Sequence, residues 1–587
     1  MSDATLTDIP ATGAATKAVK ETKAQRSERL KLAKNPWESW DEVREFAKQG
    51  RESVADEWSS LYFKWWGVYT QGDGLGVTGG SGGEGKASEF FMMRIGIPNG
   101  LLTSHQLRVI GGITKKHARN LADITTRQNI QLHWLTIADL VEVTDKLTEI
   151  GLSPKGACGD VMRNVTGCPL AGLDHHELID ASPLAVEIAH HLTANPEFYN
   201  LPRKFKITAT GCPLWCSYPE INDAALTAIK RTVNGPNGIQ DEIGYTLRVG
   251  GGLSTEPHIA VRIPAFIPQD KALDVVIAVV QIFKEQTALR ESRTHARIKY
   301  LFMKHGWTAE SMLAAIEDKI GYKLDPSPVS EDVVPDDVYR DHVGVTPQKQ
   351  PGLSSVGASV MGGRLSGDTL EALADLAEKH GDGHLRATIM QNIVIANVKN
   401  ENVRALIADL HALDLRVEVS PFWRGAIACT GTEFCKLAIA ETKVFSKWLT
   451  AEMEERLPGF DQQIKLHVTG CTNSCGQSWI ADIGLEGKKI KKDGKMVDAF
   501  YFCVGGAVGK NAKIARQIGY RAAAEDCPEA IERLLRGYLY AREPGEDLRA
   551  YFARTSDEDL RAQLNGTAVA AVERDPAPAG GRHVVEV

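Results

Sequence analysis

Residues 206–216 read KITATGCPLWC, and residues 465–475 read KLHVTGCTNSC. In each stretch an apolar, strand-like run leads into Thr-Gly-Cys, and a second cysteine follows four residues later. Two thiols at this spacing behind a strand are typical of sites for soft metals and iron–sulfur clusters. The repetition suggests that the chain is duplicated, and it leaves open whether both copies hold a metal.

Further segments repeat in the same order along the chain. NGLLTSHQL at 99–107 matches GGRLSGDTL at 362–370, TRQNI at 126–130 matches IMQNI at 389–393, INDAAL at 221–226 matches IADIGL at 480–485, and VGG recurs at 249–251 and 504–506. The shift between partners changes only slowly, so the matches are collinear. Collinear matches of this kind indicate an internal duplication.

Each copy contains a small unit and a larger one. In the small unit, the strand-like run QNIQLHWL lies between the helical patterns HQLRVIGGITKKHA and ADLVEVTDKLTEIG, as in an α/β module. The larger unit carries the cysteine loops. The predicted boundaries are an N-terminal arm at 1–60, small units at 61–150 and 346–418, larger units at 151–325 and 419–565, a linker at 326–345 and a disordered tail at 566–587. We therefore predict an internally duplicated α+β fold.

The composition is that of a globular protein. Of 587 residues 43% are hydrophobic and 24% charged, and the net charge of -7 gives no reason to expect nucleic acid or a membrane as partner. Residues 1–34 lack the apolar run of a secretory signal and are expected to be loosely ordered, while the most apolar stretch, 272–283, is about half a membrane span. We expect a cytoplasmic monomer, in which clustered cysteines indicate metal or redox chemistry.

The second copy has a complete set of cysteine ligands. ACTGTEFC places Cys429 and Cys435 six residues apart, and GCTNSC places Cys471 and Cys475 four apart. Four thiolates on two loops can surround a 4Fe-4S cluster. A structural zinc ion is the alternative, although zinc sites usually have only two to four residues between paired ligands.

CTGTEFC followed by HVTGCTNSC resembles the cluster and siroheme signature of the nitrite and sulfite reductase family. The resemblance extends from about residue 60 to 550 and includes FMMR at 91–94, TTRQN at 125–129, RN at 163–164, PLAG at 169–172, LPRKFK at 201–206 and GVTPQKQPGL at 344–353. It implies two ferredoxin-like half-modules beside two siroheme and 4Fe-4S-binding modules, related by pseudo-twofold symmetry. The first half would face a small oxyanion substrate, and the second would hold the cluster.

The resemblance also implies which residues act. The iron of a siroheme would share the sulfur of Cys475 with the cluster, and the siroheme carboxylates would need cationic or amide partners. The substrate anion would contact Arg94, Arg163, Lys204 and Lys206. The siroheme carboxylates would contact Arg127, Gln128, Asn129, Gln391 and Asn392, although the last two can also be satisfied polar groups at a sheet end.

Different motifs favour different substrates, nitrite or sulfite. TPQKQPGL and HVTGCTNSCGQSWIADIG look most like ferredoxin-dependent nitrite reductases, which favours six-electron reduction of nitrite to ammonium. A lysine at position 206, however, is similar to the residue found there in sulfite reductases. WWGVYTQ and ACGD also resemble a sulfite-reducing branch of the family in which a tyrosine and a cysteine are covalently joined. The corresponding residues here are Tyr69 and Cys158. Ordinary packing is the alternative for these two side chains. We expect a nitrite reductase, with reduction of sulfite to sulfide as the alternative. A non-catalytic electron-transfer protein would not need the four cations.

The electron donor is expected to be a separate protein. No Gly-x-Gly-x-x-Gly motif follows a strand and opens a helix, so the resemblance implies reduced ferredoxin as donor. The basic stretch KKIKKDGK at 488–495 could attract an acidic partner or be a solvated hairpin. GSGGEGKA at 80–87 lacks the Ser or Thr of a phosphate-binding loop and is interpreted as a glycine-rich loop.

The cysteine set of the first copy is incomplete. Cys212 and Cys216 correspond to the last two cluster cysteines, but apolar residues occupy the positions of the first two. We interpret TGCPLWC as the remnant of a cluster loop of a symmetric ancestor. The alternative is a second site completed by Cys158 and Cys168, neither of which stands at an equivalent position.

Overall fold

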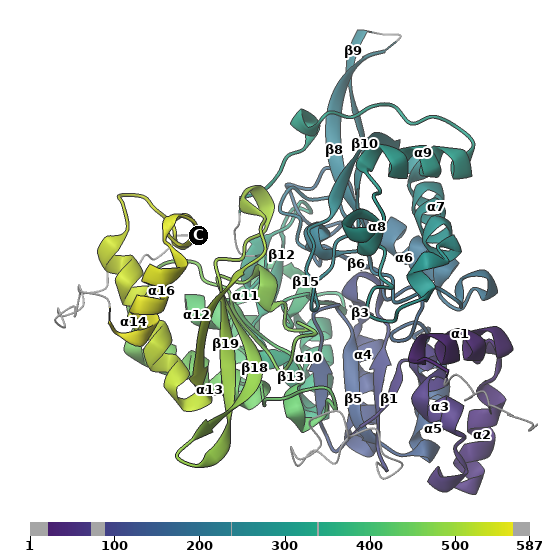
Figure 1. The fold of residues 1–587 in the computed structure, drawn as a ribbon, viewed down its shortest axis with the longest axis horizontal. Helices are drawn as coiled ribbons and strands as arrows, with labels where there is room; N and C mark the ends of the chain where they lie inside the picture. The colour runs from purple at the N-terminus through teal and green to yellow at the C-terminus, as the bar shows by residue number, and fades with distance from the viewer. Residues whose placement is uncertain (1–20, 72–88, 236–237, 337–339, 568–587) are drawn as a thin grey trace, which may run out of the picture.

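The computed structural model describes residues 21–71, 89–235, 238–336 and 340–567, which form four five-stranded sheets with helices around them (Figure 1). Two sheets belong to the small units and two to the larger units. The predicted duplicated α+β fold is confirmed.

The small units have matching elements. The first contains β1 (Val68–Thr70), β2 (Phe91–Ile95), α4 (Ser104–His117), β4 (Ala122–Ile124), β5 (Ile130–Leu135) and α5 (Ile137–Glu149), and β3 (Leu101–Thr103) lies between β2 and α4 in sequence. The second contains β11 (Gly344–Pro347), β12 (Leu353–Ala358), β13 (Arg364–Leu365), α10 (Gly367–His380), β14 (His384–Ala387), β15 (Ile393–Lys399) and α11 (Val403–Ala412).

The two small units exchange a strand. The sheet orders are β1-β2-β5-β4-β13 and β11-β12-β15-β14-β3, so each sheet ends in a strand from the other half of the chain. Arg364 of β13 lies opposite Asp123, and His384 of β14 lies opposite Thr103 of β3. Apolar side chains of both units pack into one continuous core. This reciprocal exchange produces the pseudo-twofold arrangement, because neither sheet is complete without the other half.

The larger units also match. The first contains β6 (Thr166–Gly167), α6 (Ser182–Leu192), β7 (Ile207–Thr210), β8 (Ala224–Gly235), β9 (Gly238–Val249), β10 (Val261–Pro268), α7 (Ala272–Glu285), α8 (Lys299–Lys304) and α9 (Ala309–Ile320). The second contains α12 (Pro421–Arg424), β16 (Ala426–Ala428), α13 (Lys443–Arg456), β17 (Leu466–Thr469), β18 (Ile483–Lys492), β19 (Lys495–Val504), β20 (Arg516–Ala523), α14 (Cys527–Ala541), α15 (Leu548–Arg554) and α16 (Asp557–Asn565).

Three parallel strands and two antiparallel strands make up each larger sheet, in the orders β6-β7-β8-β9-β10 and β16-β17-β18-β19-β20. The β8–β9 and β18–β19 hairpins project in opposite directions in Figure 1. The cysteine loops directly follow β7 and β17, at the carboxyl ends of the central parallel strands. This is the edge at which open α/β sheets bind ligands.

The prediction of loose order for residues 1–34 is wrong for the described part of that segment, which contains the helix Lys23–Ala33. Within the described part of the chain, α1 (Lys23–Ala33), α2 (Trp40–Gln49) and α3 (Asp56–Ser60) pack against the first small unit (Figure 1). Trp37, Trp40 and Trp58 are buried there, and the rings of Trp40 and Trp66 stack with centroids 4.1 Å apart. Indole burial supplies the apolar area that orders this segment. Residues 1–20 lie outside the described ranges.

The basic hairpin is confirmed as a hairpin. Asp493 and Gly494 join β18 to β19 with φ angles of 48° and 80°, as a type I′ turn requires. Lys489 is paired with Asp498, and Lys492 lies 2.8 Å from the carboxylate of Asp526. Part of the positive charge is therefore neutralised within the hairpin and its neighbours.

Between the halves, the described residues of the predicted linker form only a short 3-10 turn (Val329–Glu331) before β11 begins. The glycine-rich loop at 80–87 lies outside the described residues, as does the tail beyond residue 567. In the part of the chain that the structure describes, every helix is too short or too polar to cross a membrane.

Candidate active site

A cavity lies where the four units meet. The first half contributes Thr126, Arg127, Thr166, Lys204, Lys206, Ser217, Tyr218, Ile221, Asn222, Leu253, Ser254 and Arg297 to its wall, and the second half contributes Ile389, Asn473, Ser474, Cys475 and Gln477. Both cysteine-loop regions therefore border one cavity.

The two cysteine loops share an unusual backbone conformation. Trp215 and Ser474, at equivalent positions, have φ angles of 51° and 50°, and Tyr218 and Gln477 have φ angles of 52° and 62°. Left-handed backbone at non-glycine residues is uncommon and persists only where the surroundings fix it. The duplication is thus preserved in the backbone although the side chains have diverged.

The structure brings Cys429, Cys435, Cys471 and Cys475 to neighbouring loops of the second larger unit. Cys429 follows β16 and accepts a hydrogen bond from the amide N–H of Gly470 (3.1 Å), and Cys471 lies 3.5 Å from the side-chain nitrogen of Asn473. Amide donors of this kind stabilise thiolates. Cys475 is exposed and lines the cavity, so it is the thiol placed to face a group bound there.

The four thiols are not grouped tightly enough to hold one ion. Within the described residues, these four cysteines do not form a group whose ligand atoms all lie within 4.8 Å of one another, as one tetrahedral zinc ion requires. Burial, followed by the charge of Cys475, raises the pKa of Cys435 to about 12 and that of Cys471 to about 11. Metal binding must therefore displace protons from these thiols.

The cavity wall in the first half is cationic. Among the described residues, no carboxylate forms an ion pair with Lys204 or Lys206. Arg127 donates only to neutral oxygens: the side chain of Asn222 (2.9 Å) and the backbone carbonyl of Asn164 (2.6 Å). Buried positive charges without acidic partners are costly unless an anion binds beside them.

Crowding of these cations shifts their pKa values. Burial lowers the pKa of Lys204 to about 7, and Arg297 and Arg163 contribute to the shift. Burial and the neighbouring Arg127 also hold the pKa of Lys206 well below its usual range. The wall can therefore exchange protons near neutral pH and gains charge when an anion approaches.

Arg297 was missed by the sequence analysis. It forms two hydrogen bonds to the buried carboxylate of Asp223, at 2.8 and 2.7 Å, and this carboxylate also accepts the backbone N–H of Lys206 at 2.7 Å. The same arrangement occurs in the second half, where Asp482 accepts the N–H of Lys465 and pairs with Arg549. The repeat INDAAL/IADIGL marked the aspartates, but no local pattern marked their arginine partners.

Arg94 and Arg163 meet at the loop that carries Cys158. The carbonyl oxygen of Ala157 accepts hydrogen bonds from both guanidinium groups, at 3.0 and 3.3 Å, and Arg94 also lies 3.1 Å from the sulfur of Cys158. Neither arginine is among the cavity-lining residues that the structure describes. The structure thus separates the four predicted anion ligands into two lysines on the wall and two arginines beside it.

Tyr69 and Cys158 lie together. Burial raises the pKa of the Tyr69 hydroxyl, and the adjacent Cys158 raises it further. Tyr69 stands on β1, whereas Cys158 belongs to the loop of residues 157–163. Two side chains from distant segments are therefore in contact, as a covalent link between them would require.

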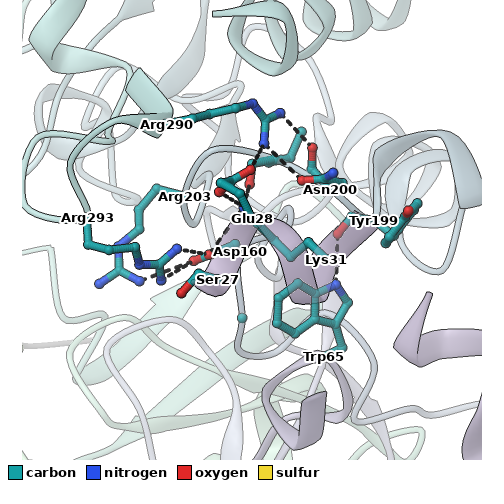
Figure 2. Close-up of polar contacts among 12 residues, drawn as sticks. Ser27, Glu28, Lys31, Trp65, Asp160, Tyr199, Asn200, Arg203, Arg290 and Arg293 are labelled. Carbon is teal, nitrogen blue, oxygen red and sulfur yellow. Dashed lines mark hydrogen bonds and ion pairs between the residues drawn. The ribbon is translucent and has the colours of Figure 1, made fainter. Parts of the chain in front are cut away.

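A buried ionic network contacts the loop of residues 157–163 through Asp160. Asp160 is paired with Arg293 and Arg203, and Lys31 of α1 lies 3.7 Å from it (Figure 2). Glu28 joins Lys31 to Arg290, which also donates hydrogen bonds to Asn200 (Figure 2) and to the backbone carbonyl of Lys284. The N-terminal helix therefore contributes to the position of the loop that carries Cys158 and Arg163.

The four amide side chains predicted to contact siroheme are not among the described residues that line the cavity wall. Gln128 and Gln391, and likewise Asn129 and Asn392, hydrogen-bond to backbone groups inside the protein and do not line the cavity among the described residues. Of the five residues predicted for the siroheme carboxylates, only Arg127 reaches the wall. The alternative given for Gln391 and Asn392, satisfied polar groups at a sheet end, matches their hydrogen bonds in the structure, and Asn129 has a similar bond.

Four thiols on paired loops beside a cation-lined cavity define a redox protein that holds an iron–sulfur cluster next to a polyanionic group. The chain belongs to the nitrite and sulfite reductase family. The family model described as the nitrite and sulphite reductase 4Fe-4S domain matches residues 158–324 and 421–569, and that of the nitrite/sulfite reductase ferredoxin-like half domain matches 84–150 and 346–413.

Individual relatives cover most of the chain. A protein named sulfite reductase [ferredoxin] 1 from Mycolicibacterium paratuberculosis is 36% identical over 91% of this chain and 96% of its own length. The assimilatory ferredoxin-dependent nitrite reductase of Haloferax mediterranei is 35% identical over 87% of this chain and 88% of its own length. The solved structure of the Mycobacterium tuberculosis NirA protein matches with a TM-score of 0.84 and 35% identity, over 91% of this chain and 97% of that one.

Siroheme and a 4Fe-4S cluster are the cofactors of this family. The residues of this chain fit both groups. The four cysteine thiols provide the soft donors of a cluster. Lys204, Lys206 and Arg127 provide cations without acidic partners for a polycarboxylate, and the buried Nε atom of Arg127 has no partner among the described residues.

Proposed function

We propose that this chain reduces sulfite to sulfide with electrons from reduced ferredoxin. The proposal rests on the presence of both Lys204 and Lys206 on the wall of one cavity, next to Arg127. Sulfite carries up to two negative charges near neutral pH and nitrite carries one, so a wall of basic groups that gain positive charge as an anion approaches favours sulfite. The contact between Tyr69 and Cys158 supports the same choice, because this pair resembles the sulfite-reducing branch of the family.

The protein's own residues have two tasks in this reaction. The first is to hold the anion: Lys204 and Lys206 attract it, and Arg94 and Arg163, fixed through Ala157, orient the neighbouring loop. The second is to supply protons, because reduction of sulfite to sulfide by six electrons removes three oxygens as water. The Nζ atom of Lys204, with a pKa of about 7, can lose and regain a proton at neutral pH.

When bound, the siroheme supplies an iron that binds the anion, and the cluster supplies electrons one at a time. We infer that Cys475 would be the cluster cysteine that faces a bound siroheme, because it is the one cluster cysteine on the wall of the cavity among the described residues. A ferredoxin is the expected donor, since several relatives are named for it. A basic hairpin such as β18–β19 could contribute to docking through its exposed Lys491 and Lys495.

Nitrite is the second candidate. The motifs TPQKQPGL and HVTGCTNSC favour it, and the relative from Haloferax mediterranei is named a nitrite reductase. TPQKQPGL lies at the start of the second small unit, and HVTGCTNSC lies in the cluster loop, whose wall residues are the uncharged Asn473 and Ser474 and the thiol of Cys475, whereas Lys206 brings a basic group to the wall. We give the wall more weight because groups that touch the anion decide the preference.

The deciding experiment compares kcat/KM for sulfite and nitrite, using ferredoxin reduced photochemically because dithionite itself releases sulfite. We expect sulfite to have the larger value. Lys206→Asn is expected to lower kcat/KM for sulfite at least about tenfold, as loss of a charged hydrogen bond would, and to affect nitrite less. Lys399→Gln, at an exposed lysine of β15 away from the cavity wall, serves as a surface control. A larger kcat/KM for nitrite in the unaltered protein would contradict the proposal.

A further inference from the structure

The first half contains a second set of metal-type donors. The sulfur atoms of Cys168 and Cys216 lie 3.4 Å apart, and those of Cys212 and Cys216 lie 3.2 Å apart. The Nε2 atom of His342 lies 3.8 Å from the sulfur of Cys168. Cys168, Cys216 and His342 place their ligand atoms within 4.8 Å of one another, and Cys212 borders this group through Cys216.

The distances among Cys168, Cys216 and His342 are close to those of ligands around one ion, and Cys212 would move toward His342 to complete the set. A zinc ion with bonds of about 2.3 Å to sulfur keeps tetrahedral ligands about 3.8 Å apart. A 4Fe-4S cube would hold its thiolates much farther apart. Three thiols and one imidazole are also a donor set that structural zinc sites use, with all four positions filled by protein.

The donors come from three segments that meet in the interior. Cys168 follows β6, Cys212 and Cys216 form the loop after β7, and His342 precedes β11. The three cysteines are between 0% and 3% exposed, and Leu170, Leu173, Val394 and Ala396 pack around them. An apolar shell of this kind excludes water and is typical of closed structural sites.

His342 is held in place by its surroundings. Its φ angle is 55°, in the left-handed region, and its carbonyl oxygen would lie 1.7 Å from a Cβ atom at Gly357. The two residues before it are anchored to opposite halves: Arg340 donates to the carbonyl of Trp215 at 2.9 Å, and Asp341 pairs with Arg424 at 2.7 Å. The imidazole therefore reaches the thiols from a segment fixed on both sides.

We propose that Cys168, Cys212, Cys216 and His342 form a structural zinc site. Zinc binding would release the protons of the thiols and join the segment before β11 to the loop that leads to Ser217 and Tyr218 of the cavity wall. TGCPLWC is then more than the remnant of a cluster loop: two of its thiols are kept, and Cys168 and His342 replace the two lost ligands. Cys158, the other thiol considered for this role, lies with Tyr69 instead.

The test uses untagged holoenzyme from cells grown with added zinc. Metal analysis is expected to give one zinc ion per chain, and X-ray absorption at the zinc edge is expected to show three sulfur neighbours at about 2.3 Å and one nitrogen at about 2.0–2.1 Å. This measurement needs no variant, and neither the iron groups nor the choice between sulfite and nitrite affects it.

Variants then assign the ligands. Cys212→Ala and His342→Ala are expected to lower the zinc retained after dialysis against a chelator at least about tenfold, with iron and labile sulfide unchanged. Cys503→Ala, at a buried cysteine of β19 outside the group, should keep its zinc. Holoenzyme without zinc, unchanged zinc in Cys212→Ala, or a disulfide within the cysteine group would each overturn the proposal. If a variant does not fold, the X-ray absorption spectrum of the unaltered protein at the zinc edge decides whether three sulfur atoms and one nitrogen bind zinc.

Discussion

Gln128 and Gln391 occupy equivalent positions in the two halves, and the side-chain amide of each donates a hydrogen bond to the backbone of the other half. Gln128 donates to the carbonyl of Ala387 at 3.0 Å, and Gln391 donates to the carbonyl of Ile124 at 3.1 Å. Both have left-handed backbone, with φ angles of 58° and 63°. The repeated QNI motif thus joins the two small units across the pseudo-twofold axis.

Each glutamine also reaches a larger unit. The side-chain oxygen of Gln128 accepts the N–H of Gly167 at 2.9 Å, and that of Gln391 accepts the N–H of Ala428 at 3.1 Å. We expect Gln128→Met to lower the free energy of unfolding by about 2–4 kcal/mol, because buried backbone groups lose their partners.

Urea unfolding of the holoenzyme measures this loss, and Gln49→Met on the exposed face of α2 is the control, with an expected change below about 0.5 kcal/mol. A direct role for Gln128 in holding siroheme would instead lower siroheme content while leaving stability nearly unchanged.

Anion binding should depend on the protonation of Lys204. Its pKa is about 7 in the protein alone, lowered first by burial, and the carboxylates of a bound siroheme would raise it. Below this pKa the ammonium is charged and attracts the anion, and above it the attraction is lost. We expect the affinity of the holoenzyme for sulfite to fall as the pH rises through a value at or above 7, measured by optical titration.

Two substitutions at this position separate charge from proton exchange. Lys204→Arg stays charged, so its affinity should lose the pH dependence. Lys204→Met should bind about 10- to 100-fold more weakly at low pH, which corresponds to loss of one charged hydrogen bond. An unchanged pH profile in both variants would assign the dependence to another group, such as Lys206.

Tyr69 and Cys158 are predicted to be covalently joined in the mature protein. Formation of a bond between the tyrosine ring and the cysteine sulfur removes two hydrogen atoms and requires an oxidant, so the intact protein should be lighter by that mass. Peptide mapping should find the two segments joined. Tyr69→Phe should abolish the joined peptide and restore the mass expected for the variant without a link. Separate peptides in active, unaltered holoenzyme would show that the two side chains only pack together.

The sequence predicted what depends on repeated local patterns. The collinear repeats predicted the duplicated fold, and the family motifs located the cluster cysteines and the two lysines of the wall. It could not predict the exchange of β3 and β13, because such short strands have no periodicity of their own. The partners Arg297 and His342 were missed for a related reason: each is distant in sequence from the residues that it contacts, and a single arginine or histidine carries no pattern.

The N-terminal helix α1 was not predicted because ionic contacts, and not an apolar face, fix much of it against the rest of the protein. Ala24, Leu30 and Lys31 are its buried residues, and Lys31 contacts Glu28 and Asp160 (Figure 2). A buried lysine in a polar stretch looks the same in sequence as a solvated one. The same network underlies the last prediction.

Asp160→Asn should destabilise the protein and loosen the loop that carries Cys158 and Arg163. Burial alone would raise the pKa of Asp160, but Arg293, Arg203 and Lys31 hold it well below its usual range. Its stabilisation is therefore complete above the ordinary aspartate pKa of about 4 and is lost as the pH falls below that value. Removing the charge leaves Arg293 and Arg203 without their carboxylate partner, and because both are partly exposed we expect a cost of about 2–3 kcal/mol, below that of a fully buried unpaired charge.

Denaturant unfolding at pH 7 measures this cost, and sulfite affinity reports on the loop. Asp145→Asn, which breaks the half-exposed pair with Arg44, is the matched control and should cost less than about 1 kcal/mol. We expect Asp160→Asn to be the less stable variant at pH 7 and to approach the unaltered protein in stability at low pH, since the carboxylate is then protonated in both states. An equal loss in the two variants at pH 7 would mean that the network around Asp160 does not hold the loop.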